Sequence, residues 1–84
     1  MKWGLVIVSR AKRQLRRLSA EEQDRISETL VEMSQNPFYG DAKYLRGVDT
    51  MRRRVGDWRI LYELNESKKT IIVTAIKRRG SNTY

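Results

Sequence analysis

The most chemically suggestive segment of the 84-residue sequence is "TMRRRVGDWRILYEL", residues 50–64, which carries four arginines within eight residues. They are Arg52, Arg53, Arg54 and Arg59. The segment is typical of a β-hairpin with a two-residue turn at Gly56-Asp57, which places Arg54 directly opposite Arg59. Like charges that face each other on a sheet repel and cost stability. Guanidinium groups bind phosphate oxygens bidentately and stay charged at any working pH, so a face that holds phosphates would explain this arrangement.

Strand alternation assigns the basic side chains to the two faces of the expected sheet. A four-residue loop, "NESK", predicts that Leu64 pairs with Lys69 on the last strand. In this register the predicted core positions of that strand are Ile71, Val73 and Ala75. The predicted outer-face arginines are Arg52, Arg54, Arg59 and Arg78. Lys77 then falls on the core side, and we expect Arg53 at the sheet edge with its head group in water.

The outer face has two interpretations, a solvated strand face with incidental charge or a phosphate-binding face. Four convergent arginines beside an aromatic tail favour the second. If such a face also cleaved a phosphodiester, it would need a base, an acid and charge stabilisation of the phosphorane. The sequence has no histidine, and Asp57 in the turn and Glu63 on the outer face are thin support for a Mg²⁺ site. The residues therefore favour a metal-free site, with no cofactor, whose main work is electrostatic.

Composition limits the class of protein. The chain is expected to form one domain, residues 1–84, and it has no cysteine, which excludes a disulfide scaffold and a Cys/His zinc site. Small secreted domains usually need disulfides, so a cytoplasmic location is expected. The apolar run "WGLVIV" is too short to span a bilayer. The net charge of +8 indicates a polyanionic partner: nucleic acid, an anionic membrane or an acidic protein segment.

The elements that position the arginines follow from periodicity and capping. A strand is predicted at 3–8, a basic helix at 9–18 and a second helix at 20–35. Ser19 and Glu22 match the capping box that begins the second helix, and the proline after Asn36 ends it. Three further strands are predicted at 51–55, 58–64 and about 69–78, after an irregular connector. The expected fold is α+β: an N-terminal strand, a helical hairpin and a three-strand antiparallel meander, with the helices on one sheet face.

The first helix carries a basic surface around its apolar stripe. Its apolar residues are Ala11, Leu15 and Leu18. Its basic residues are Arg10, Lys12, Arg13, Arg16 and Arg17. This surface could dock on nucleic-acid phosphates in a salt-sensitive way, or it could be the solvated face of an amphipathic helix. The sequence leaves both interpretations open.

Nearly the whole chain resembles the RelE/ParE superfamily of bacterial toxins from toxin–antitoxin pairs. The segments that carry the resemblance are "KYLRG", "RRRVGDWRILYEL" and "IKRRGSNTY". They match, in order, a Leu-x-Gly turn, a basic-x-basic strand with Gly-Asp-aromatic-Arg, and a basic pair followed by a tyrosine. The resemblance implies the small α+β fold derived above.

The resemblance also implies a set of catalytic residues. Arg52 and Arg54 match the basic-x-basic pair, Arg59 the arginine after the aromatic, Arg78 the tail arginine, and Tyr84 the tyrosine. This set is typical of the RelE branch. RelE-type toxins often have lysines at the two strand positions, and an arginine cannot serve as a general base in their place. The remaining candidates for the base are Tyr84, Lys77 or solvent. Tyr84 is favoured because neighbouring guanidinium groups would lower the pKa of its hydroxyl from about 10.

The resemblance implies the toxin of a toxin–antitoxin system, with ribosome-dependent mRNA endoribonuclease activity that inhibits translation. The expected partners are an antitoxin with an acidic toxin-binding segment, the ribosome and mRNA, and operator DNA only through the antitoxin; no membrane is expected. Two alternatives remain, a ParE-like inhibitor of DNA gyrase and a non-catalytic RNA-binding module. The expected RNA-binding residues are Arg10, Lys12, Arg13, Arg16, Arg17, Lys43, Arg46, Lys77 and Arg79.

Overall fold

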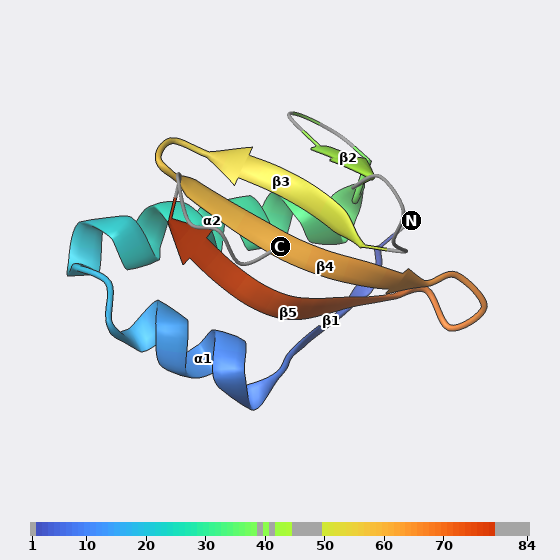
Figure 1. Ribbon diagram of the computed structural model, residues 1–84. Coiled ribbons are helices and arrows are strands. Elements are labelled where there is room, and N and C mark those ends of the chain that lie inside the picture. Colours follow the sequence, from blue (N-terminus) through green and yellow to red (C-terminus); the bar gives the residue numbers. More distant parts are fainter. Residues whose placement is uncertain (1, 39, 41, 45–49, 79–84) are drawn as a thin grey trace.

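The computed structural model describes residues 2–38, 40, 42–44 and 50–78. In chain order the elements are β1 (Gly4–Ile7), α1 (Ser9–Arg16), α2 (Ala20–Gln35), β2 (Ala42–Tyr44), β3 (Met51–Val55), β4 (Trp58–Asn65) and β5 (Thr70–Arg78). The strands form one sheet in the order β1-β5-β4-β3-β2, with β1 parallel to β5 and the other pairs antiparallel. Figure 1 shows α2 running behind this sheet and α1 beside β5. The predicted α+β architecture is confirmed, with a mixed sheet.

The helical hairpin begins and ends close to the predicted residues. The capping box at Ser19 is present: the Glu22 backbone N–H donates to Ser19 Oγ at 3.2 Å, and the Ser19 N–H donates to Glu22 Oε1 at 3.1 Å. Helix α2 has the predicted bounds, whereas α1 ends two residues earlier than predicted, at Arg16. The segment expected as an irregular connector contains β2, a three-residue strand antiparallel to β3.

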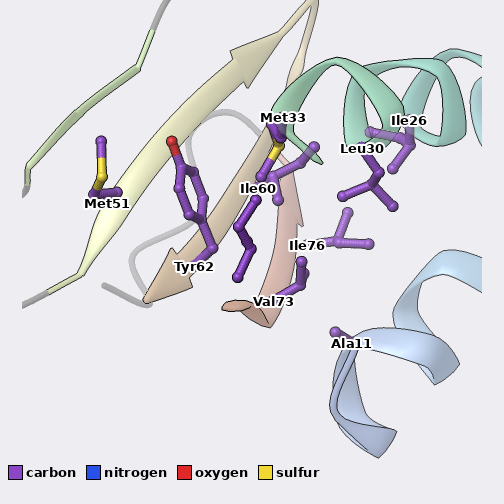
Figure 2. Packing of buried hydrophobic residues seen from close by; sticks show 10 residues of the cluster. Ala11, Ile26, Leu30, Met33, Met51, Ile60, Tyr62, Val73 and Ile76 are labelled. Atoms are coloured by element: carbon purple, nitrogen blue, oxygen red, sulfur yellow. The ribbon is translucent and has the colours of Figure 1, made fainter. Parts of the chain in front are cut away.

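The core lies between the two helices and one face of the sheet (Figure 2). Its buried apolar residues are Ala11, Ile26, Leu30, Met33, Met51, Ile60, Tyr62, Ile71, Val73 and Ile76. The predicted helical stripes therefore do face the sheet. At the centre, the fully buried Tyr62 donates its hydroxyl hydrogen to the Pro37 carbonyl at 2.6 Å, which satisfies the phenol and ties the end of α2 to β4.

The hairpin between β3 and β4 has the predicted register. Val55 pairs with Trp58 and Arg54 pairs with Arg59. Gly56, with φ of 56°, occupies the first central position of the turn, where a positive φ favours glycine. The next loop also has four residues, but it lies one position later than predicted, because Asn65 pairs with Thr70 and Leu64 with Ile71.

A β-bulge in β5 overturns part of the predicted face assignment. Tyr62 pairs with Val73, but the preceding residue of β4, Leu61, pairs with Ala75, so Thr74 is an extra residue in β5. A bulge of one residue reverses which face the following side chains occupy. The prediction that Lys77 lies on the core side is therefore wrong. Ala75 is fully buried, as predicted, but it pairs with Leu61 and so lies on the face opposite the helices.

The residues after the bulge show the reversed alternation. Ile76 pairs with Ile60 and is 3% exposed in the core. Lys77 pairs with Arg59, and Arg78 pairs with Trp58 on the helix side. The prediction that Arg78 lies on the outer face is therefore wrong as well.

Among the described helices, neither is long and apolar enough to cross a membrane.

Candidate functional site

A row of three basic residues crosses the sheet on the face opposite the helices. Arg54 on β3 pairs with Arg59 on β4, and Arg59 pairs with Lys77 on β5. Arg52 lies two residues before Arg54 on the same face, opposite Leu61. We call these four residues, Arg52, Arg54, Arg59 and Lys77, the cationic face. Three of the four predicted outer-face arginines are thus brought together, and Lys77 takes the place expected for Arg78.

Arg59 is held in place by the hairpin turn that precedes it. Its Nη1 donates to the Gly56 carbonyl at 3.3 Å and to the Trp58 carbonyl at 3.1 Å. The residue is 7% exposed although it lies outside the apolar core cluster. These contacts fix the guanidinium near the centre of the cationic face, so that little side-chain entropy remains to be lost on binding an anion.

Arg52 has a buried donor that finds no acceptor among the described residues. The residue is 7% exposed, and its Nε has no hydrogen-bond partner in that part of the chain. A buried N–H without an acceptor costs about 1–3 kcal/mol. An oxygen of a bound anion would satisfy it. Arg54, by contrast, is exposed at the edge of the face.

The described part of the cationic face contains little negative charge. Glu63, which pairs with Ile72, is exposed on the same sheet face. Asp57 lies in the hairpin turn and is also exposed. Within the described ranges, three or more His, Cys, Asp or Glu side chains nowhere come together as a metal site. The face can therefore attract and hold phosphate groups through guanidinium and ammonium donors.

Arg53 lies on the helix side of the sheet, where the structure gives it a structural role. It is 8% exposed, and its Nη2 contacts Glu32 Oε1 of α2 at 2.9 Å. The expectation that its head group lies in water is wrong, because α2 supplies a carboxylate within reach. The guanidinium also lies against Gly40: a Cβ at that glycine would come within 2.7 Å of its central carbon.

Arg78 is exposed, with its guanidinium 5.4 Å from the centre of the Trp58 ring. The Trp58 indole N–H donates to Glu22 Oε2 at 3.1 Å, which links β4 to the start of α2. The pKa of Glu22 is lowered, mainly by the Ser19 backbone N–H, then by the Trp58 N–H, with a smaller Coulombic contribution from Arg78. Arg78 therefore belongs to a cluster on the opposite side of the sheet from the cationic face.

The other predicted RNA-binding residues are only partly placed. Lys12, Arg13 and Arg16 are exposed on α1, and Arg17 is exposed at its C-terminal cap, as either interpretation of that helix requires. Arg10 is exposed too, but its Nη2 donates to the Thr74 carbonyl at 3.4 Å. Lys43 pairs with Arg52 through the β2–β3 ladder, and its side chain lies outside the described part of the structure. Arg46, Arg79 and Tyr84 also lie outside the described residues.

Sequence reasoning missed the bulge at Thr74, which sets the face on which Lys77 lies, and the contacts that Gln14 and Thr74 make there. The Ile76 backbone N–H donates to Gln14 Oε1 at 2.6 Å, and the Thr74 hydroxyl donates to the Leu61 carbonyl at 3.2 Å. Gln14 is a partly buried polar residue next to Leu15 on the apolar stripe of α1. In the sequence, the only hint was an uncharged polar residue directly before Leu15, since nothing in "IIVTAIK" indicates a bulge.

A small basic α+β protein with this sheet and a cationic face is the kind of molecule found among toxins of toxin–antitoxin pairs. Residues 5–82 match the family model described as the ParE toxin of the type II toxin–antitoxin system, parDE. The chain therefore belongs to this toxin family, in the RelE/ParE superfamily. No curated protein matches the sequence.

Several solved structures of RelE proteins have the same fold. The chain is similar to one from the RelBE2 toxin–antitoxin complex of Mycobacterium tuberculosis, with 22% identity, a TM-score of 0.86, and 94% of this chain and 100% of that chain covered. It is similar to one from the archaeal RelE–RelB complex of Pyrococcus horikoshii, with 27% identity, a TM-score of 0.85, and coverage of 95% and 98%. The isolated RelE toxin of Escherichia coli matches with 22% identity, a TM-score of 0.81, and coverage of 95% and 87%.

Proposed function

We propose that this toxin is an endoribonuclease that cleaves mRNA in the ribosome and so inhibits translation. The observation that carries the proposal is the cationic face, with Arg54, Arg59 and Lys77 in one row. Beside this row lies the buried Nε of Arg52, which has no hydrogen-bond acceptor among the described residues. An RNA phosphate supplies the oxygen acceptors that these donors match, and guanidinium groups bind such oxygens in pairs. The similarity to RelE folds supports the same activity.

The chemistry proposed is attack of a ribose 2′-oxygen on the adjacent phosphorus. The 2′-O–P bond forms and the P–O5′ bond breaks, which leaves a 2′,3′-cyclic phosphate and a 5′-hydroxyl. Arg52, Arg54 and Arg59 would bind the non-bridging oxygens and stabilise the charge that grows on the phosphorane. Arginine does not exchange its proton at working pH, so the base and the acid must come from other groups. Tyr84 remains the proposed base.

Dependence on the ribosome fits a site of this kind. Charge stabilisation without paired histidines makes a weak ribonuclease, because the reacting groups must also be aligned. Positioning of the mRNA by the ribosome can supply several kcal/mol, within the limit of about 7–11 kcal/mol known for well-oriented reactions. The exposed basic residues of α1 would contribute rRNA contacts that weaken as salt rises.

The proposed protein partner is an antitoxin whose toxin-binding segment is acidic. The M. tuberculosis and P. horikoshii structures are complexes of RelE with RelB. Carboxylates from such a segment would neutralise the cationic face and compete with phosphate. Contact with operator DNA would be made through the antitoxin, and the location would be the cytoplasm.

Inhibition of DNA gyrase is the second candidate, and the description of the matching family as the ParE toxin favours it. A gyrase inhibitor acts by binding a protein and has no need of an anion-binding row. Substitution of Arg59 would then leave toxicity intact.

An assay with ribosomes programmed with a defined mRNA tests the proposed function. Arg54→Ala is the informative variant because Arg54 is exposed, so its removal leaves the core unchanged. Lys68→Ala is the matched control, because it removes one positive charge from the exposed loop after β4. We expect the parent and Lys68→Ala to cut within codons and Arg54→Ala to cut far more slowly. Equal cutting by all three, or no cutting by the folded parent, would contradict the proposal.

A further inference from the structure

One edge of β5 pairs with strand β1 before the bulge and packs against helix α1 after it. Strand β1 pairs with β5 as far as Val73, and the Val8 N–H donates to the Val73 carbonyl at 3.1 Å. Beyond that point α1 lies along β5 (Figure 1). The helix supplies side chains where a strand would supply backbone groups: Arg10 donates to the Thr74 carbonyl, and Gln14 accepts from the Ile76 N–H.

The bulge decides which side chain stands beside Arg59. With Thr74 as the extra residue, Arg59 pairs with Lys77, and Ile76 is buried with Ile60. Without it, continuation of the Tyr62–Val73 register would pair Arg59 with Ile76. Lys77 would then move to the helix side, opposite Trp58. The bulged register therefore places the Lys77 ammonium group on the cationic face, whereas a register without the bulge would place the Ile76 side chain there.

Gln14 makes the tighter of the two helix contacts to this segment. Its Oε1 lies 2.6 Å from the Ile76 nitrogen, whereas the Arg10 contact is 3.4 Å and comes from an exposed side chain. Gln14 is partly buried, and Ile76 is almost fully buried. Loss of the Gln14 oxygen would leave the Ile76 N–H without its acceptor in an apolar setting, which disfavours this arrangement of the strand.

We propose that Gln14 is a positioning residue that holds the Thr74 bulge and so keeps Lys77 on the cationic face, where its ammonium group donates the proton to the departing 5′-oxygen. The second half of this inference rests on the proposed function. The proton balance is simple: the base takes the 2′-hydroxyl proton, the P–O5′ bond breaks, and Lys77 gives its proton to the 5′-oxygen. On the described part of the cationic face the other members are arginines, which do not give up a proton.

The test compares Gln14→Met with Gln14→Glu in the full chain. Methionine keeps the length and helix propensity of glutamine but accepts no strong hydrogen bond, whereas a glutamate oxygen can accept from the Ile76 N–H. With programmed ribosomes we expect Lys77→Met to lower the rate at saturating substrate by about 10²–10⁴-fold. Gln14→Met should lower that rate with little change in KM, and Gln14→Glu should recover most of it.

The double variant Gln14→Met/Lys77→Met separates positioning from a general loss of stability. If Gln14 acts through Lys77, the double variant should be no slower than Lys77→Met alone. Losses that multiply in the double variant would overturn the inference, as would full activity of Gln14→Met or failure of Gln14→Glu to recover it.

An NMR measurement of strand register tests the positioning role of Gln14 without relying on RNA cleavage. Cross-strand NMR contacts between the Hα atoms of Ile60 and Ile76 report the bulged register directly, because the Ile76 N–H points to Gln14 and this pair therefore exchanges no backbone hydrogen bonds. We expect these contacts in the parent and in Gln14→Glu, and their loss or exchange broadening in Gln14→Met. Their full retention in Gln14→Met would overturn the positioning role. A folded parent that shows them but cuts no RNA would instead refute the proposed function and the role of Lys77 as proton donor.

Discussion

The four arginines of residues 52–59 have two different roles, which depend on the face of the sheet where each side chain lies. Arg53 contacts Glu32 of α2 and is buried on the helix side, where it joins the layers. Arg52, Arg54 and Arg59 lie on the opposite face, with Lys77 beside them. Similar residue types thus stabilise the fold at one position and form the candidate site at the next.

Arg59→Ala tests the centre of the cationic face. We expect cleavage to be abolished and the free energy of unfolding to fall by no more than about 3 kcal/mol. Loss of the two donations, to Gly56 and to Trp58, costs about 1–3 kcal/mol at about 0.5–1.5 kcal/mol for each hydrogen bond, and relief of the repulsion with Arg54 returns about 0.2–1 kcal/mol. Urea unfolding and the ribosome assay measure both effects. A loss above about 3 kcal/mol with unchanged cleavage would make Arg59 a structural residue.

Tyr84 lies outside the described residues, so its proposed role as base is tested by substitution alone. If the hydroxyl is the base, Tyr84→Phe should slow cleavage by about 10²–10⁴-fold. If the ring only stacks on a nucleotide, Phe should behave like the parent and Ala should lose about 1–3 kcal/mol of binding. Parental rates for both variants would show that the base is another group.

At the scale of elements, Glu22 joins the start of α2 to β4. Its lowered pKa means that the carboxylate is favoured in the folded state, so its contribution to stability is present above its usual pKa of 4.5 and is lost as the pH falls through the lower folded-state value. We expect the parent to exceed Glu22→Gln in stability near neutral pH and the difference to shrink in acid. Chemical denaturation at pH 7 and below pH 4 would measure this, and a difference that grows in acid would contradict the assignment.

Among the glycines that the structure describes, Gly40 is the one whose replacement should most disturb the contact between α2 and the sheet. It has φ of 79°, and a Cβ there would meet the Arg53 guanidinium at 2.7–2.9 Å. We expect Gly40→Ala to cost about 1–3 kcal/mol, from backbone strain and displacement of Arg53 from Glu32. Gly4→Ala is the control, because its Cβ would meet atoms only at ordinary distances of 3.6 and 3.8 Å. Equal effects of both in urea unfolding would refute this account.

Local signals in the sequence predicted the elements well where the chemistry is local. The Ser19–Glu22 box fixed the start of α2, and the glycine at position 56 fixed the hairpin register that pairs Arg54 with Arg59. The bulge at Thr74 could not be predicted in this way, because the side chain that contacts the bulged segment, Gln14, lies 62 residues from Ile76 in sequence. The faces of Lys77 and Arg78 were therefore predicted wrongly, although the strand itself was correct.

At the scale of the whole molecule, carboxylates of α2 lie beside the basic residues that stabilise the fold on the helix side of the sheet. Glu22 and Glu32 of α2 face the Trp58–Arg78 pair and Arg53 on the helix side. On the described part of the other face, Glu63 accompanies the cationic residues. A net charge of +8 attracts polyanions at long range, and the cationic face offers them a specific binding site.

The measurement that tests the central claim most directly is transcript mapping by primer extension after induction of the toxin in growing cells, beside a gyrase supercoiling assay with the purified protein. We predict growth arrest with cuts within codons of translated mRNAs. The cuts should be absent for Arg54→Ala and present for Lys68→Ala, and gyrase should be unaffected by the protein. Growth arrest without such cuts, together with inhibition of gyrase that survives Arg54→Ala, would contradict the account.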